Sequence, residues 1–314
     1  MSKHTLIDPW PSLPLDQWED TRATLHMWMQ IPGKVCLALT PIVNHYWNVT
    51  LRYTPRGLVT PVMNQGDKAF NMAFDFVEHQ VVITFSDGMT RSLPLEPQTV
   101  ADFYVKFMGL LRDEGVEVDI WTTPVEVENP IPFEKDTTHR SYDAASVSAF
   151  WRMLLDIKPV FDQFRSEFLG KCSPLHFFWG GFDLALTRFS GRRAPERANA
   201  DAMTRESYSH EVISHGFWPG GNGVNEPAFY AYASPEPEGF DKANVQPSAA
   251  NYNPDLGMFI LPYEAIRGSS DRSRDLMSFL RTTYDAGATL GNWNRGELER
   301  REVPAPHVVT QKSS

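Results

Sequence analysis

Apolar residues recur along the chain with two different periods, and the shorter period predicts strands. Segments rich in β-branched and aromatic residues, several of them alternating apolar with polar positions, are typical of strands that bury one face. Asp87-Gly88 lies between two of these segments and predicts a hairpin with a type I′ turn. The expected strands cover residues 35–40, 47–53, 72–76, 81–85 and 89–93, and then 175–178, 182–189, 207–214, 228–233 and 258–261.

The longer period, with apolar residues three and four positions apart, predicts helices. The expected helices cover residues 21–30, 100–111, 144–168 and 271–290. Pro32-Gly33 is expected to end the first helix, and Pro159 is expected to kink or split the third.

Strands and helices together predict an α+β fold with mostly antiparallel sheets covered by helices. The Pro-rich segment 122–143 is expected to join two halves, residues 1–121 and 144–302, of one domain that spans 1–314. The strings His45-Tyr46-Trp47 and His176-Phe177-Phe178-Trp179 begin similar stretches in the two halves. Aligning them needs a gap of several residues, so we favour chance similarity between aromatic strands and keep an internal duplication as the alternative.

Composition narrows the class of protein. Hydrophobic residues make up 42% of the 314 residues and aromatic residues 12%, which predicts a large aromatic core. The formal net charge of −10 disfavours general nucleic-acid binding. We expect no membrane partner, because no apolar run is long enough to span a bilayer. With no secretory signal and only Cys36 and Cys172, far apart, the sequence predicts a soluble cytoplasmic protein with reduced thiols.

The segment 170–193 has the most chemical promise. Gly180-Gly181 separates two aromatic runs and predicts a two-residue hairpin loop, in which His176 pairs with Ala185 and Phe178 with Asp183. Alternation then sorts the side chains into a core face and a polar face. The core face holds Phe177, Trp179, Phe182, Leu184 and Leu186, and the polar face holds His176, Phe178, Asp183, Ala185 and Thr187.

On the polar face, His176 and Asp183 are diagonal neighbours within side-chain reach. A carboxylate beside an imidazole fixes its tautomer and raises its pKa, which suits a general base. His210 and Glu211, on a neighbouring expected strand, complete the candidate catalytic set, although a satisfied surface contact explains the His–Asp pair equally well. The same residues also allow a dispersed metal site, but the metal and any cofactor stay unknown.

His210-Glu211 and His215 do not form a zinc-protease motif. The two histidines are five residues apart instead of four, and the segment between them reads as a strand.

Arginines follow the hairpin at positions 188, 192, 193, 197 and 205. Guanidinium groups match carboxylates and phosphates, so Arg188 and Arg192, with Trp179, are candidates for binding a small anionic molecule. Acidic residues stand among these arginines, and a solvated, salt-bridged loop is the competing interpretation.

Long strings along the chain resemble a bacterial family known as domain of unknown function 5996. They are WPSLPLDQWEDT, TLHMWMQIPGK, FLGKCSPLHFFWGGFDLALTRFSGRRAP, YSHEV and AFYAYASPEPEGF. The resemblance covers about residues 10–293 and implies one family-length domain. It implies no reaction, cofactor or site residue.

Two classes of function therefore stand side by side. The first is a small-molecule binding protein or enzyme with a polar cleft beside the hairpin 175–189. The second is a non-catalytic interaction protein, for example a homodimer that buries aromatic side chains at its interface. The sequence does not decide whether the protein is an enzyme.

Overall fold

The computed structural model describes residues 8–221 and 223–301 and confirms the α+β fold with two antiparallel sheets. The first, called here the N-terminal sheet, has six strands in the order β1-β2-β4-β5-β6, with β3 paired to β4. Its strands are β1 (Arg52–Tyr53), β2 (Gly57–Val59), β3 (Met63–Gln65), β4 (Lys68–Asp75), β5 (Gln80–Phe85) and β6 (Thr90–Pro94).

The second sheet, called the C-terminal sheet, also has six strands, in the order β11-β12-β10-β9-β8-β7. Its strands are β7 (His176–Phe178), β8 (Asp183–Arg193), β9 (His210–Trp218), β10 (Ala228–Ser234), β11 (Asn251–Asn253) and β12 (Met258–Pro262). Leu51 and Phe177 exchange two backbone hydrogen bonds, each of 2.9 Å, and so connect the segment before β1 to β7.

The hairpin between β5 and β6 forms, but the predicted turn type is wrong. Only Gly88 has a positive φ, of 90°, and its N–H donates to the carbonyl of Phe85. A type I′ turn needs positive φ at both central positions, and Asp87 does not have it.

The first helix is much longer than predicted. Helix α1 covers Leu15–Leu39, so Pro32-Gly33 does not end it and residues 35–39 are not a strand. The helix is buried around the proline, because Trp28, Ile31 and Val35 are all inaccessible to solvent. This packing compensates for the hydrogen bond that a proline removes.

The predicted strand 47–53 is also mostly wrong. Residues Asn44–Val49 form the 3₁₀ segment η1, and only Arg52–Tyr53 join a sheet. His45 and Tyr46 have left-handed backbone conformations, with φ of 59° and 60°. Two consecutive left-handed residues turn the chain away from the extended path.

The other three long helices form close to where their stripes predict. Helix α2 covers Val100–Asp113, α3 covers Ala144–Ser166 and α6 covers Arg272–Leu290. Pro159 lies inside α3 without splitting it. The short elements are η2 (Phe133–Lys135), α4 (Ala202–Ser207), η3 (Phe240–Lys242), α5 (Tyr263–Arg267) and α7 (Arg295–Leu298).

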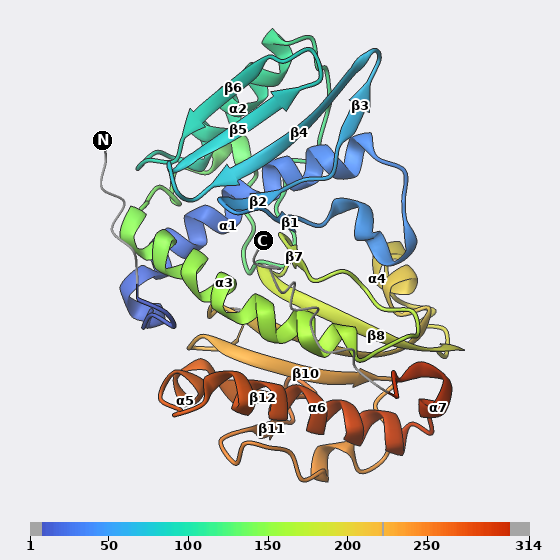
Figure 1. The fold of residues 1–314 in the computed structure, drawn as a ribbon. Coiled ribbons are helices and arrows are strands. Elements are labelled where there is room, and N and C mark those ends of the chain that lie inside the picture. The colour runs from blue at the N-terminus through green and yellow to red at the C-terminus, as the bar shows by residue number, and fades with distance from the viewer. Residues whose placement is uncertain (1–7, 222, 302–314) are drawn as a thin grey trace, which may run out of the picture.

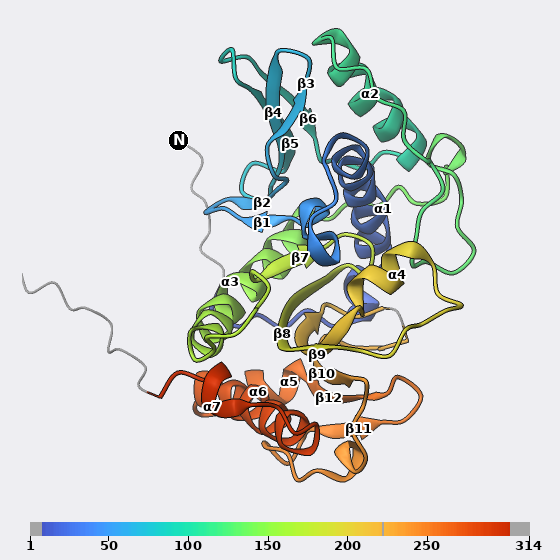
Figure 2. The same cartoon turned by 90° about the vertical axis from the view of Figure 1, so that its right-hand side faces the viewer.

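Helices cover the two sheets and fill the space between them. In Figure 1, α3 crosses in front of β8, while α6 lies on the far side of β10 from the N-terminal sheet. Helix α3 contacts β8 and α6, and α6 contacts β9 and β10. Figure 2 shows α1 beside α2 and above the C-terminal sheet. Buried apolar side chains from both sheets and from α1, α2, α3 and α6 form one continuous cluster.

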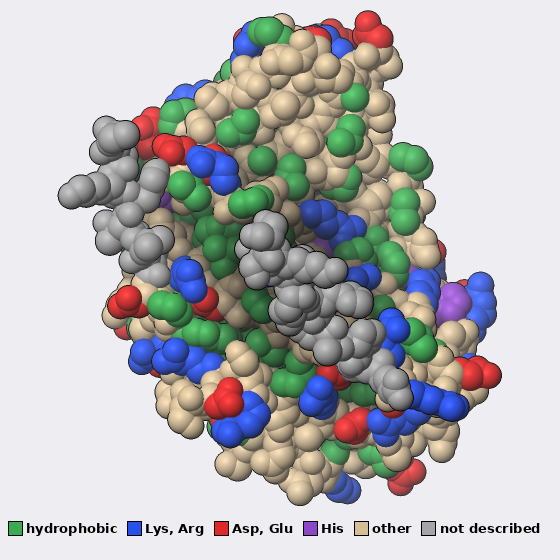
Figure 3. All heavy atoms as spheres, viewed as in Figure 1, with side chains coloured by type: hydrophobic (Ala, Val, Ile, Leu, Met, Phe, Trp, Pro, Cys, Tyr) green, Lys and Arg blue, Asp and Glu red, His purple; other side chains and the backbone are tan. Residues whose placement is uncertain are grey.

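Basic and acidic side chains are mixed on the surface. Figure 3 shows Lys and Arg side chains interspersed with Asp and Glu over the lower part of the face in view. None of the helices in the described part of the chain combines the length and the apolar character that a bilayer span requires.

Candidate functional site

The hairpin between β7 and β8 has the predicted register but a different loop. His176 pairs with Ala185 and Phe178 with Asp183, as expected. Four residues, 179–182, then form the turn, and the positive φ belongs to Phe182, at 54°, instead of to the glycines. The two glycines are therefore not required by their backbone conformation.

Carboxyl groups lie against both glycines. A Cβ at Gly180 would lie 2.5 Å from Oε1 of Glu126, and a Cβ at Gly181 would lie 2.8 Å from Oδ1 of Asp183 and 3.2 Å from Oε2 of Glu126. A side chain at either position would therefore push these carboxyl groups out of place. The loop thus brings two acidic groups, from separate segments of the chain, close to Gly181.

Asp183 is 9% exposed and accepts a hydrogen bond from a tyrosine. The hydroxyl of Tyr230, on β10, donates to Oδ2 of Asp183 over 2.6 Å. Burial raises the pKa of Asp183 to about 7, with a contribution from the charge of Glu126, while the Tyr230 hydrogen bond opposes the rise. A carboxyl group with this pKa exchanges its proton near neutral pH.

Glu126 reaches the same place from the Pro-rich segment 122–143. Glu126 remains partly exposed to solvent. Its backbone has a positive φ of 55°. The surrounding protein, and next the charge of Asp201, raise the pKa of Glu126. Both carboxyl groups near Gly181 are therefore easier to protonate than an ordinary surface carboxyl.

Helix α1 contributes a buried arginine. Nε and Nη2 of Arg22 each donate to Glu19 over 2.8 Å. The side chain of Arg22 is only 7% exposed, and its Nη1 has no hydrogen-bond partner among the described residues. A Cβ at Gly221 would lie 2.6 Å from the guanidinium carbon, so this glycine leaves the space that Arg22 occupies.

Two histidines, His26 on α1 and His139 from the segment 122–143, lie near Arg22. Nε2 of His26, one turn beyond Arg22, donates to the carbonyl of Gly180 over 2.7 Å. Burial lowers the pKa of His26 to about 3, so this imidazole is neutral. By contrast, the hydrogen bond from Nδ1 of His139 to Asp136, 2.7 Å long, raises the pKa of His139.

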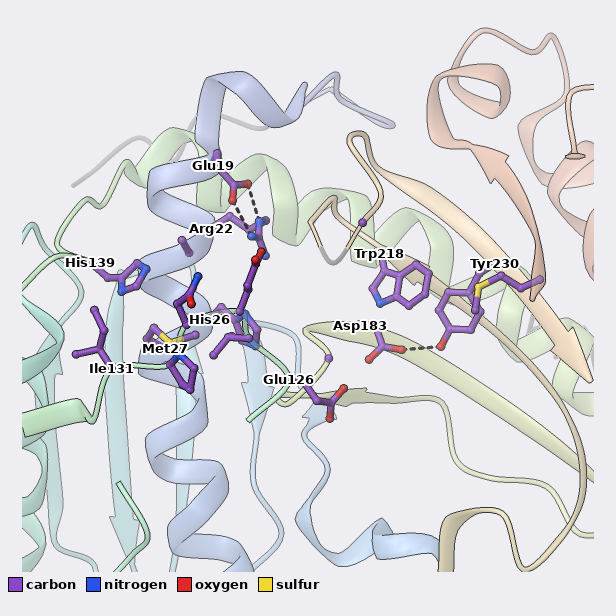
Figure 4. Close-up of a pocket in the computed structure, with 18 of the residues that line it drawn as sticks. Glu19, Arg22, His26, Met27, Glu126, Ile131, His139, Asp183, Trp218 and Tyr230 are labelled. Carbon is purple, nitrogen blue, oxygen red and sulfur yellow. Dashed lines mark hydrogen bonds and ion pairs between the residues drawn. The ribbon is translucent and has the colours of Figure 1, made fainter. Parts of the chain in front are cut away.

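These groups line a cavity of about 920 Å³, which we call the acidic cleft. Figure 4 shows Arg22 and His26 on α1 facing Asp183, Trp218 and Tyr230, with Glu126 between the two walls. The ring of Trp218 packs against Tyr230 at a tilt of 38°, with centroids 4.5 Å apart, and its Nε1 is buried without a partner among the described residues. Further lining residues are Glu19, Met27, Glu128, Ile131, His139, Gly181, Tyr208, Tyr232 and Met258.

His176 does not lie on an open polar face, so that part of the prediction is wrong. It is 0% exposed, with Nδ1 3.1 Å from the hydroxyl oxygen of Thr50 and 3.4 Å from Nη1 of Arg52. Burial and the charges of Arg52 and Arg165 hold the pKa of His176 well below its usual value. The prediction that Asp183 raises the pKa of His176 is therefore also wrong, because Asp183 is hydrogen-bonded to Tyr230 instead.

His210 and Glu211 do not join His176 either. Glu211 accepts from Arg192 over 2.7 Å at the surface, and Nδ1 of His210 lies 3.1 Å from the hydroxyl oxygen of Ser209. The alternative metal site does not form from these residues, and the described part of the chain holds no group of three or more His, Cys, Asp or Glu side chains arranged around one point.

The three candidate ligand-binding residues have structural partners. The guanidinium of Arg188 is buried against the ring of Phe164, 3.5 Å from its centroid. Arg192 donates to Glu211 and to the carbonyl of Asn292. Nε1 of Trp179 donates to the carbonyl of Val49 over 2.9 Å. Their predicted contact with a ligand is not tested by these arrangements, but none of them lines the acidic cleft.

A second cavity, of about 660 Å³, lies beside α4. It includes His210 and four basic residues, Lys171, Arg193, Arg197 and Arg205, together with Glu196 and Glu206. We call it the basic cavity.

The sequence prediction thus found one wall of the acidic cleft, Gly181 and Asp183, and missed the others. Arg22, Glu126 and Tyr230 lie far from the hairpin in the sequence, and no motif connects them. The available signal was Gly216, which pairs with Tyr230 in the sheet. A Cβ there would lie 2.3 Å from the Tyr230 hydroxyl oxygen, so only glycine lets the phenol cross β9 toward Asp183.

The fold and the cleft define an α+β protein with a carboxylate-lined cavity between its first helix and its C-terminal sheet. The chain belongs to the family of unknown function DUF5996, whose model matches residues 10–300. No curated protein and no solved structure matches the chain.

Proposed function

We propose that the acidic cleft binds a small polar molecule and that Asp183, together with Glu126, exchanges a proton with it. One observation carries the proposal: two carboxyl groups from distant segments meet at Gly181 on the wall of a cavity of about 920 Å³. Cavities of this size are typical of small-molecule sites.

Burial supports the proposed proton exchange. With a pKa of about 7, Asp183 is present in both protonation states at neutral pH, and it can donate or accept. Tyr230 fixes the orientation of the carboxyl group through its hydrogen bond to Oδ2, which leaves Oδ1 on the side of Gly181 and Glu126. Neutral His26 keeps a second positive charge away from this end of the cleft.

The test is a ligand-observed NMR screen of a library of small polar compounds against wild-type protein and two variants. Asp183→Asn removes the titrating group, and Asp255→Asn changes an exposed aspartate at the turn between β11 and β12 as a control. We expect bound compounds whose affinity changes with pH around 7 in wild type and in Asp255→Asn. In Asp183→Asn, the affinity should fall by roughly tenfold or more and the pH dependence should disappear. Absence of any bound compound, or equal affinity and pH dependence in all three proteins, would refute the proposal.

The small anion expected from the sequence has a different candidate place, the basic cavity. Lys171, Arg193, Arg197 and Arg205 are the observation that favours it, although Glu196 and Glu206 reduce the local positive charge. The test is a titration with inorganic phosphate, in which a thermal-shift assay measures the melting temperature of the protein. We expect stabilisation that weakens in Arg193→Gln, and an unchanged melting temperature at millimolar phosphate would count against the anion.

A further inference from the structure

The chemistry of the acidic cleft narrows the class of ligand that the proposed function requires. Two residues that line the cavity, Arg22 on α1 and Trp218 on β9, each carry a buried N–H nitrogen without a partner among the described residues, Nη1 and Nε1. A buried donor without an acceptor costs free energy, and a ligand oxygen at this position would remove that cost. A ligand that satisfies these two donors therefore has to offer acceptor oxygens to both walls of the cleft.

The cleft also offers acceptors. Asp183 and Glu126 meet at Gly181, and the Tyr230 hydroxyl already occupies Oδ2 of Asp183. The remaining carboxylate oxygens accept hydrogen bonds from hydroxyl groups. A ligand that contacts both the unpartnered donors and the carboxyl groups consequently needs groups that both donate and accept, and hydroxyl groups do both.

The charge of the lining argues against an anion. Glu19 already pairs with Arg22 through two hydrogen bonds, so this guanidinium carries little uncompensated positive charge. Glu126, Glu128 and Asp183 also line the cleft. An anionic ligand would enter against several carboxyl groups.

A cationic ligand is also disfavoured, because it would leave the two unpartnered donors without acceptors. The remaining wall is aromatic. Trp218 packs at a tilt against Tyr230, and Tyr230 stacks on Tyr232 with centroids 6.1 Å apart. The hydroxyl groups of Tyr232 and Tyr208 are 3.1 Å apart and extend this wall. Aromatic surface with polar tips suits molecules that have both apolar and hydroxyl faces.

We infer that the ligand of the acidic cleft is a neutral, oxygen-rich molecule of the sugar or polyol class. Its oxygens accept from Arg22 and Trp218, and its hydroxyl groups donate to Asp183 and Glu126. The inference rests on the proposed function, since it takes the acidic cleft to be the binding site.

Calorimetric titration and saturation-transfer NMR with named probes test the inference. The neutral probes are glucose, cellobiose and myo-inositol, and the charged probes are citrate and spermidine. We expect at least one neutral probe to bind the wild-type protein at millimolar concentration, and the charged probes to bind more weakly.

Two conservative variants locate the binding. Trp218→Phe removes the indole N–H and keeps an aromatic ring, while Arg22→Lys keeps a cation beside Glu19 but lacks the second arm of the guanidinium fork. Each should weaken the neutral probe by roughly 3- to 10-fold, as expected for the loss of one hydrogen bond. Trp121→Phe, at a tryptophan 67% exposed and outside the cleft, is the matched control and should bind as wild type does.

The outcomes separate this inference from the proposed function. If only citrate or spermidine binds and Asp183→Asn abolishes that binding, the ligand class is wrong and the proposed function stands. If a neutral probe binds equally well to Trp218→Phe and Arg22→Lys, it binds elsewhere and the inference is overturned. If no probe binds, the sugar or polyol class is rejected, and the screen of polar compounds decides separately whether the cleft binds anything.

Discussion

At the scale of single residues, the acidic cleft depends on positions that carry no side chain. Gly216 leaves room for Tyr230 to cross β9, Gly181 leaves room for two carboxyl groups, and Gly221 leaves room for the guanidinium of Arg22. Gly216 and Gly181 do not have a positive φ, so for these two a close approach is the reason for glycine. Tyr230, the two carboxyl groups near Gly181 and Arg22 are thus each matched by a missing Cβ on a neighbouring strand or loop.

Asp183 should make the stability of the protein depend on pH. Its pKa is raised from 3.8 to about 7 by folding, so between these values the folded state binds more protons than the unfolded state. The free energy of unfolding should therefore fall as pH rises from about 4 to about 7. We expect Asp183→Asn to lose this slope and to gain stability relative to wild type at pH 8, by up to about 4 kcal/mol.

Urea denaturation at pH 5 and pH 8 measures the effect. Buried neutral His26 contributes the opposite slope, because its pKa is lowered to about 3 and stability is lost as pH falls below 6.5. The difference between wild type and Asp183→Asn cancels this contribution. An equal pH dependence in both proteins would show that Asp183 titrates normally.

The register of the β7–β8 hairpin was predictable because it depends on local alternation and on a short loop. The burial of His176 was not, because Thr50 and Arg52, more than a hundred positions earlier in the sequence, pack against it. Alternation separates the two faces of a strand but does not tell whether a second layer covers the outer face. The His–Asp pair failed as a prediction for this reason.

At the scale of elements, α1 shows how tertiary packing overrides local signals. Pro32-Gly33 reads as a helix end in sequence, yet the helix continues to Leu39. The ring of Trp179 lies directly on Gly33, where a Cβ would be 2.3 Å from the ring. A glycine that lowers helix propensity is thus retained by a close contact with the hairpin.

The same substitution should have opposite effects in two helices. Gly33→Ala would place a methyl group inside the Trp179 ring and should destabilise the protein by roughly 1 to 3 kcal/mol or more. Gly109→Ala, in α2, meets nothing within 4 Å and should stabilise it by about 1 kcal/mol. Denaturation midpoints in urea check both variants. A destabilised Gly109→Ala or a neutral Gly33→Ala would contradict the packing described for these helices.

The helices with one clean apolar stripe, α2, α3 and α6, were predictable because their pattern alone defines the buried side. The meander β4–β6 was predictable because its strands are neighbours both in sequence and in the sheet. Residues 35–39 were not, because a short run of five apolar residues after Pro32-Gly33 resembles a strand as much as the last turns of a helix.

At the scale of the whole molecule, the two sheets share one core. The apolar cluster includes Trp28 and Phe103 on one side and Phe150 and Phe217 on the other, and the Leu51–Phe177 bridge joins the two parts of the backbone. The division into halves 1–121 and 144–302 is a prediction from sequence, as is the single family-length domain.

From the shared core we expect the chain to unfold in one cooperative transition. Differential scanning calorimetry should give a calorimetric enthalpy equal to the van't Hoff enthalpy, and far- and near-ultraviolet circular dichroism should change together. Two separate transitions would indicate two independently folding halves.

Light scattering on the same sample tests the predicted homodimer, for which the exposed side chains of Trp121 and Val105 are available on the surface.

The placement of the tryptophans has a practical consequence. The chain contains nine, and Trp121 is the one whose side chain is largely in contact with water, whereas Trp218 stands at the wall of the acidic cleft. Iodide should therefore quench a long-wavelength part of the emission that Trp121→Phe lacks. In that variant, a change of fluorescence on adding a sugar would come from tryptophans shielded from iodide, and Trp218 would report occupancy without any attached dye.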